Sequence, residues 1–243
     1  MLKEFRIKNF RSINEEQTFT MEACPDSVVS EFPEHVIHYK GESLLRVSSM
    51  YGPNGGGKST LIHAIRTVIA VVSNIPLLCD DDDDKTNIPS VFCKSNDSSF
   101  EIFVISTNYE IGYSLVVDLS RSKEGNNREF FHYRKKEIDV NIKHEELVYR
   151  KLDSKEFISL FERDSKGTVK SDLLKELDFL KNNLNLSSSN TFLKYIVSTF
   201  SKISNEYLQP VFEFASNIYS FVVFHEPRTK IILLFYFFYK SNL

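Results

Sequence analysis

The chain has 243 residues, of which 42% are hydrophobic and 26% are charged, and its formal net charge is -3. This composition is typical of a globular protein with a substantial core, and it excludes an intrinsically disordered chain. The small negative charge gives no general attraction to nucleic acid or to anionic lipid, so nucleic-acid binding would need a local basic patch.

The cysteines and the first residues indicate the compartment. Cys24, Cys79 and Cys93 are odd in number and far apart, which argues against a disulfide framework or a zinc motif. Residues 1–11 alternate in character and lack the uninterrupted apolar core of a signal peptide. We therefore expect a cytoplasmic protein with no membrane segment.

The chain opens with a pattern typical of β-strands. Apolar and basic residues mostly alternate over residues 2–11, which predicts a half-buried strand. Phe19 and Met21 indicate a second strand after a turn. From Cys24 to Glu42 the periodicity is lost and prolines and a glycine appear, so we expect a loop there.

Residues 47–60 carry the clearest motif, Val-Ser-Ser-Met-Tyr-Gly-Pro-Asn-Gly-Gly-Gly-Lys-Ser-Thr. They match the Walker A phosphate loop, in which backbone N–H groups surround phosphates, a lysine reaches the β and γ oxygens, and a serine binds Mg²⁺. Residues 44–50 resemble a buried strand, and the residues after Gly57 have helical periodicity up to Asn74 and Pro76. A glycine-rich turn that matches by chance is the alternative. The predicted site residues are Gly52, Pro53, Asn54, Gly55, Gly56, Gly57, Lys58, Ser59 and Thr60, with Ser59 as the metal ligand.

Two charged runs follow. Asp80 to Asp84 are five consecutive carboxylates, which predicts a solvated loop. A Mg²⁺ site is the alternative, although adjacent carboxylates on one loop do not converge on an octahedral ion. The basic run 134–136 is predicted to be an exposed hairpin tip, with a nucleic-acid contact as its alternative.

The rest of the chain changes from strand to helix. Short aromatic and β-branched runs between Phe100 and Arg163, separated by turn residues, predict an antiparallel meander. Helices are predicted after Ser171, after Asn190 as the capping residue, and near Pro210. The apolar run 231–239 is too short to cross a bilayer and is expected to be a core element or a surface that meets a partner.

Two segments together resemble a known family. Asn-Phe-Arg-Ser at residues 9–12, with Gly-x-Asn-Gly-x-Gly-Lys-Ser-Thr at residues 52–60, resembles the N-terminal lobe of ABC-type ATPases of the SMC/RecF/OLD group. The chain looks most like stand-alone ATP-binding proteins of bacterial phage defence. The resemblance implies a mixed sheet with an antiparallel subdomain, bound ATP and Mg²⁺, and head-to-head dimers. It also implies that Arg11 and Ser12 lie near the nucleotide, an ordinary charge at a strand end being the alternative for Arg11.

Two motifs that the family requires are not intact. Phe221 to Phe224 precede His225 and Glu226, so the Walker B strand would carry histidine where the family has the aspartate that supports Mg²⁺. Residues 186–190 have the outline of the signature motif without its glycines. A buried strand and a helix cap at Asn190 are the preferred interpretations of these segments. The glutamine that senses Mg²⁺ in the family is also in doubt, since the chain has only Gln17 and Gln209.

The sequence thus predicts an α/β P-loop NTPase fold with a mixed sheet, an antiparallel β subdomain and a following helical segment. The expected divisions are an ATP-binding lobe at 1–165, a helical segment at 166–218, and an apolar strand or incomplete second lobe at 219–243. We expect an ATP-binding protein of phage defence or DNA maintenance that hydrolyses ATP only when a second lobe is supplied. Its partner would be a second copy or another ATPase chain, with a nuclease or other effector. A non-hydrolysing nucleotide sensor is the alternative, and a GTPase is disfavoured because no Asn-Lys-x-Asp sequence is present.

Overall fold

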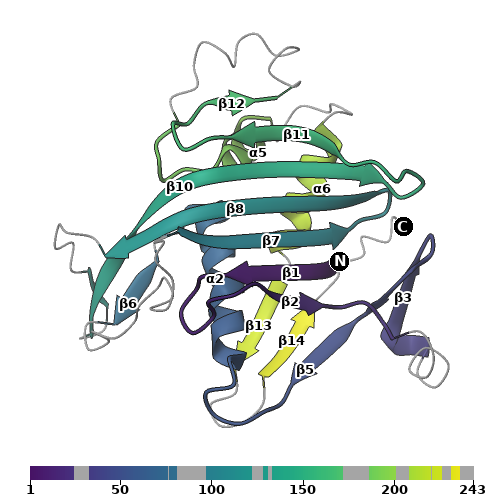
Figure 1. Cartoon of the computed structure of the whole chain (residues 1–243), viewed down its shortest axis with the longest axis horizontal. Helices are drawn as coiled ribbons and strands as arrows, with labels where there is room; N and C mark the ends of the chain where they lie inside the picture. Colours follow the sequence, from purple (N-terminus) through teal and green to yellow (C-terminus); the bar gives the residue numbers. More distant parts are fainter. Residues whose placement is uncertain are drawn as a thin grey trace.

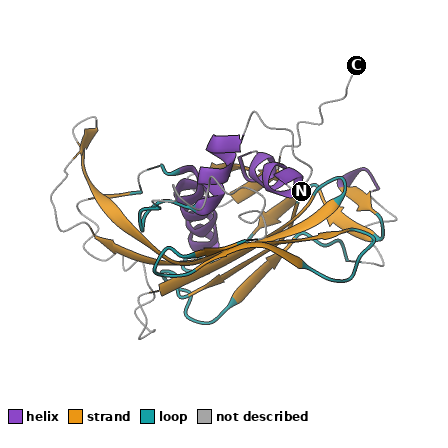
Figure 2. Cartoon of the chain, turned by 90° about the horizontal axis from the view of Figure 1, so that it is seen from above, coloured by secondary structure: helices purple, strands orange, loops and turns teal. Residues whose placement is uncertain are grey.

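An antiparallel β-sheet with helices on one face makes up the body of the protein (Figures 1 and 2). This computed structural model describes residues 1–24, 33–75, 77–80, 97–121, 128–130, 133–171, 186–200, 208–219, 221–225 and 231–235. In spatial order the main strands are β12 (Val169–Lys170), β11 (Ile158–Arg163), β10 (Tyr133–Lys151), β8 (Tyr109–Arg121), β7 (Asp97–Ile105), β1 (Leu2–Lys8) and β2 (Gln17–Thr20). The short strands β6 (Leu78–Asp80) and β9 (Arg128–Phe130) also pair with β10.

The predicted α/β P-loop NTPase fold with a mixed sheet is wrong. Every pair of adjacent strands among the described residues runs antiparallel, and helices are few. The physical reason lies in the connections: β7 and β8 are joined by residues 106–108 alone, a link that suits antiparallel neighbours, whereas parallel neighbours need a long crossover. The predicted meander is therefore the main sheet itself and not an appendage to a parallel one.

Three smaller differences concern individual elements. The segment predicted to be a loop before Glu42 contains β3 (Val36–Tyr39), which forms a hairpin with β4 (Glu42–Leu45) after the short 3₁₀ helix Pro33–His35. Lys40 (φ 35°) and Gly41 (φ 101°) form the two-residue turn, whose positive φ angles suit the twist of a hairpin. The single buried strand predicted for residues 44–50 is instead the end of β4 plus β5 (Val47–Met50), in which Val47 is 42% exposed.

The basic run 134–136 does not form a hairpin tip. It lies within β10, where Lys135 pairs in register with Asp80 of β6 on one side and with Arg128 of β9 on the other. Because β10 begins at Tyr133, the run lies close to the start of this strand, where β9 pairs with it.

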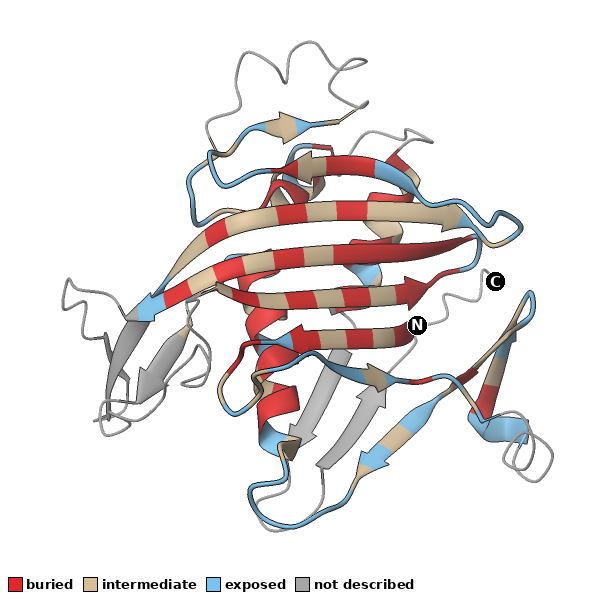
Figure 3. Ribbon diagram, in the orientation of Figure 1, coloured by how far each residue is buried: buried red, intermediate tan, exposed pale blue. Residues whose placement is uncertain are grey.

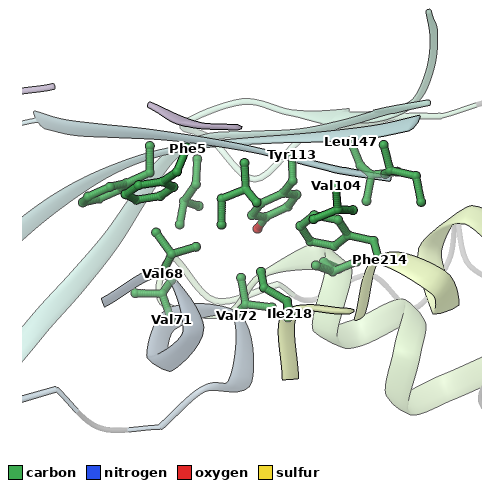
Figure 4. Packing of buried hydrophobic residues seen from close by; sticks show 14 of the residues in the cluster. Phe5, Val68, Val71, Val72, Val104, Tyr113, Leu147, Phe214 and Ile218 are labelled. Atoms are coloured by element: carbon green, nitrogen blue, oxygen red, sulfur yellow. The ribbon is translucent and has the colours of Figure 1, made fainter. Parts of the chain in front are cut away.

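The helices cover the inner face of the sheet. They are α2 (Lys58–Ser73), α5 (Phe192–Phe200) and α6 (Gln209–Tyr219). Figure 4 shows Val68, Val71 and Val72 of α2 facing sheet residues such as Phe5 and Val104, with α6 contributing to the same core. Buried and half-buried residues alternate along the strands, as expected for a sheet with one covered face (Figure 3). The helix predicted after Ser171 falls on residues that lie outside the described ones.

A second, three-stranded sheet holds β5. Its order is β13 (Phe221–His225), β14 (Ile231–Phe235) and β5, and both pairings are antiparallel. Since β14 lies between them, β5 and β13 run in the same direction. This small sheet carries the segment that enters the glycine-rich loop.

Candidate phosphate-binding site

The glycine-rich loop joins the end of β5 to the first residue of α2, at the bottom of the view in Figure 1. Gly55 (φ 84°) and Gly57 (φ 82°) adopt left-handed backbone angles, which residues with a Cβ rarely do. Gly57 is the N-cap residue of α2, and no side chain there accepts a hydrogen bond from the helix amides. The loop therefore brings open backbone to the positive end of a helix dipole.

Three of the loop glycines face open space at the position where a Cβ would stand. A Cβ placed on Gly52, Gly55 or Gly57 would meet no atom within 4 Å, whereas one on Gly56 would lie 3.1 Å from the carbonyl oxygen of Pro53. Residues 52–56 are all exposed (Figure 3). A phosphate group thus has direct access to the backbone of the loop.

Lys58 folds back over the loop. Its Nζ donates hydrogen bonds to the carbonyl oxygens of Gly52 and Pro53, each at 2.8 Å. The ammonium is therefore held at the rim of the loop by two backbone carbonyl oxygens. A phosphate oxygen could replace either carbonyl, because a charged acceptor forms the stronger bond with an ammonium group.

Ser12 and Thr60 connect the β1–β2 turn to the start of α2. Their hydroxyl oxygens lie 3.1 Å apart, and Thr60 is buried. Ser59, the predicted metal ligand, is exposed beside it. Arg11 has a left-handed backbone (φ 52°), and its guanidinium lies 5.9 Å from the ring centre of Phe10. Of the two residues that the family resemblance places near the nucleotide, Ser12 lines the cavity described next and Arg11 does not.

A cavity of about 670 Å³ lies between this turn and the loop. One wall comes from β5, the loop and α2, and the other comes from Ile7 and from residues 12–15 and 17–19. Sequence periodicity did not identify this second wall. It includes Gln17, whose role as the Mg²⁺-sensing glutamine was doubted because of its position in the sequence. The lining residues are Ile7, Ser12, Ile13, Asn14, Glu15, Gln17, Thr18, Phe19, Ser49, Met50, Tyr51, Gly55, Gly56, Gly57, Lys58 and Leu61.

The segment with the outline of a signature motif has a different environment. The predicted cap Asn190 is wrong, because the Thr191 hydroxyl accepts the hydrogen bond from the Lys194 backbone N–H at 3.3 Å. The first amides of α5, those of Phe192 and Leu193, donate to the carboxylate of Glu145 at 2.7 and 2.9 Å. An internal carboxylate thus occupies the position where a phosphate would bind to this helix.

Glu145 is completely buried, and burial raises its pKa above the ordinary value. The α5 amides, the Tyr113 hydroxyl at 3.0 Å and the Arg163 guanidinium act in the opposite direction. Within the predicted meander nothing marked Glu145 as a buried anion, because its neighbours His144 and Glu146 are polar as well.

Residues 221–225 form a strand, as predicted. His225 pairs in register with Ile231, and Ile231 pairs with Met50, so β13 and β5 finish at the same end of the small sheet, on its two opposite edges. Two strand spacings separate them, which is about 10 Å. Glu226 lies outside the described residues.

The described part of the chain contains no group of three or more histidine, cysteine, aspartate or glutamate side chains placed to hold a metal ion. No helix there has the length and hydropathy needed to cross a membrane. The aspartate run beyond Asp80 lies outside the described residues.

No protein-family model matches this chain, and comparison with curated proteins gives no significant match. The loop geometry therefore carries the functional argument by itself.

Proposed function

We propose that this chain binds the triphosphate tail of ATP through the loop Gly52–Thr60. The observation that carries the proposal is the open backbone at Gly55 and Gly57, directly before α2, with the Lys58 ammonium at its rim. Backbone amides, a helix N-terminus and one lysine are the elements with which proteins bind polyphosphate. The adjoining cavity gives room for the rest of a nucleotide.

Mg²⁺ would accompany the nucleotide. Ser59 fits this role because its hydroxyl is an oxygen ligand, its side chain is exposed, and it lies next to Lys58 in the first turn of α2. The ion, when bound, would neutralise charge on the β and γ phosphates. The residues of this chain hold the phosphate tail and shield one side of it from water.

The test is titration of a fluorescent ATP analogue against the wild-type protein and Lys58→Ala. We expect Lys58→Ala to lose about 2 to 4 kcal/mol of binding free energy, because a charge and its phosphate hydrogen bonds are removed. Lys155→Ala is the matched control, since Lys155 is exposed in the turn before β11 and away from the loop. Equal affinities of wild type and Lys58→Ala would refute the proposal.

A second candidate is a nucleotide sensor that does not hydrolyse ATP. Two observations favour it. The first amides of α5 are occupied by Glu145, and β13 ends in His225 at the position where the family that the sequence resembles has an aspartate. Imidazole is a poor ligand for Mg²⁺, which prefers oxygen. Steady-state phosphate release by the wild type that is lost in Glu226→Gln would reject the sensor in favour of an enzyme.

A role in phage defence or DNA maintenance follows from the sequence resemblance alone. In that role a second copy or another ATPase chain would be its partner, and a nuclease or other effector would act downstream. Size-exclusion chromatography with and without Mg-ATP would test the first part. A nucleotide-dependent change of mass supports it, and an unchanged monomer in both conditions contradicts it.

A further inference from the structure

The cavity beside the phosphate loop has an acidic residue on its second wall. Glu15 is the acidic side chain among the described residues that line it. Its carboxylate accepts a 3.2 Å hydrogen bond from Asn14 Nδ2, so a neighbouring amide helps to orient it. Both residues lie in the turn between β1 and β2, outside the glycine-rich motif, and Glu15 is exposed like its neighbour Glu16.

A carboxylate is an unfavourable neighbour for a triphosphate. Like charges repel, and the repulsion grows as water is displaced from the site. A cavity with an anion-binding loop on one wall and a carboxylate on the other is therefore suited to a ligand with two different ends. One end is anionic, and the other donates hydrogen bonds.

A nucleoside triphosphate has these two ends. Ribose hydroxyls and the amino group of adenine are donors, and acidic side chains bind ribose hydroxyls in dinucleotide sites. The cavity volume of about 670 Å³ lies within the range of small-molecule sites, and Ile13 and Phe19 add apolar surface near Glu15. Inorganic polyphosphate would use only the wall formed by the loop.

We propose that Glu15 accepts a hydrogen bond from the nucleoside part of the ligand and so makes the site prefer a nucleoside triphosphate to inorganic polyphosphate. This inference rests on the proposed function, because it presupposes that the phosphates lie on the loop. It adds a residue that determines specificity outside the glycine-rich motif.

The experiment is calorimetric titration of wild type, Glu15→Ala and Glu16→Ala with Mg-ATP and with Mg-tripolyphosphate. Glu16 is the matched control, because it is adjacent and exposed but does not line the cavity. We expect Glu15→Ala to weaken ATP binding about tenfold, as for a charge-assisted hydrogen bond, and to leave tripolyphosphate binding unchanged. Glu16→Ala should bind both ligands like the wild type.

The other outcomes separate the two proposals. Tighter binding of both ligands by Glu15→Ala would place the carboxylate beside the phosphates, weaker binding of both would place it on the metal, and no change would remove its role; each overturns the inference. Failure of the wild type to bind either ligand would instead refute the proposed function. If Glu15→Ala behaves as expected, titration with two analogues identifies the donor group of the ligand. 2′-deoxyATP lacks a ribose hydroxyl and inosine triphosphate lacks the amino group of the base, so the analogue that binds more weakly to the wild type lacks the donor.

Discussion

The guanidinium of Arg163 and the carboxylate of Glu145 lie 3.8 Å apart, and both side chains are almost completely inaccessible to solvent. Arg163 also donates hydrogen bonds to the carbonyl oxygens of Ser187 (2.9 Å) and Asn190, while Glu145 accepts from the first amides of α5. The pair therefore attaches the 187–193 segment to strands β10 and β11. Neither charge is left alone in the core, which is the condition for burying it.

Replacing the buried carboxylate should destabilise the fold. Glu145→Gln keeps one acceptor oxygen but leaves Arg163 without its anion, and we expect a loss of about 2 to 4 kcal/mol in the free energy of unfolding. Urea denaturation followed by circular dichroism measures this loss. Glu146→Gln, on the half-exposed outer face of the same strand, is the control and should change stability by less than about 0.5 kcal/mol. Equal midpoints for the two variants would contradict the role of Glu145.

The same residue predicts a dependence of stability on pH. Burial raises the pKa of Glu145 from its ordinary value of 4.5, so above pH 4.5 the folded state binds more protons than the unfolded state. The free energy of unfolding should therefore fall as pH rises from 4.5 to the folded pKa. Urea midpoints measured over this range should show the slope in wild type and not in Glu145→Gln.

Asp164 should change stability with pH in the opposite direction, which provides an internal control. The hydrogen bond from the Thr168 backbone, followed by that from Lys166, lowers the pKa of Asp164 below 3.8. Its contribution is present above pH 3.8 and is lost as pH falls through the folded pKa. Asp164→Asn should thus leave the slope above pH 4.5 intact, and a slope removed by Asp164→Asn would disprove the assignment to Glu145.

Gly112 on β8 should not tolerate a side chain. An added Cβ would lie 2.8 Å from Phe103 Cε1 and 3.0 Å from Val148 Cγ2 on the outer face of the sheet. Phe103 also lies beneath the Arg6 guanidinium, 5.1 Å from the ring centre, which restricts its movement. We expect Gly112→Ala to cost about 1 to 3 kcal/mol by thermal denaturation.

The double variant Gly112→Ala/Phe103→Leu tests this explanation. If the ring is the obstacle, the second change should recover part of the stability lost by Gly112→Ala, giving a non-additive cycle. If the effects of the two substitutions on stability are strictly additive, the loss caused by Gly112→Ala does not come from a clash with the Phe103 ring.

Lys3 on β1 should contribute to stability through three carboxylates. Its Nζ lies 3.4 Å from Glu22, 3.0 Å from Glu42 and 3.3 Å from Glu110. Burial alone would lower the pKa of Lys3, but hydrogen bonding to Glu42 and the charge of Glu110 outweigh it and raise the pKa. Lys3→Met should lower the free energy of unfolding by about 2 to 3 kcal/mol, because the three carboxylates then repel one another. Lys8→Met, exposed on the same strand, should have little effect, and similar losses in both variants would exclude the ion-pair explanation.

Local elements were predictable where local forces decide them. Alternating residues identified β1, aromatic and β-branched runs indicated β7 and β8, and the glycine-to-lysine step located the start of α2 at Lys58. The fold class was not predictable, because it depends on which strands become neighbours. The interposition of β14 between β5 and β13 joins segments from distant parts of the chain, and no local pattern encodes it.

The same reasoning applies to the candidate site. Lys58 and the glycines belong to one contiguous motif, so their spacing alone indicated them. Glu15 and Gln17 line the cavity only because β2 folds back along β1, and Glu145 reaches the first amides of α5 only because β10 lies beside that helix. Contacts made through tertiary structure leave no periodic trace in the sequence.

The position of β14 also has a consequence for biosynthesis. Without residues 231–235, β5 would have no ladder partner among the described strands, and the loop that follows it would start from an unsupported edge. A nascent chain should therefore acquire affinity for nucleotide late, after most of the main sheet has left the ribosome. Ligand capture would then report that residues 231–235 have joined β5 in the small sheet.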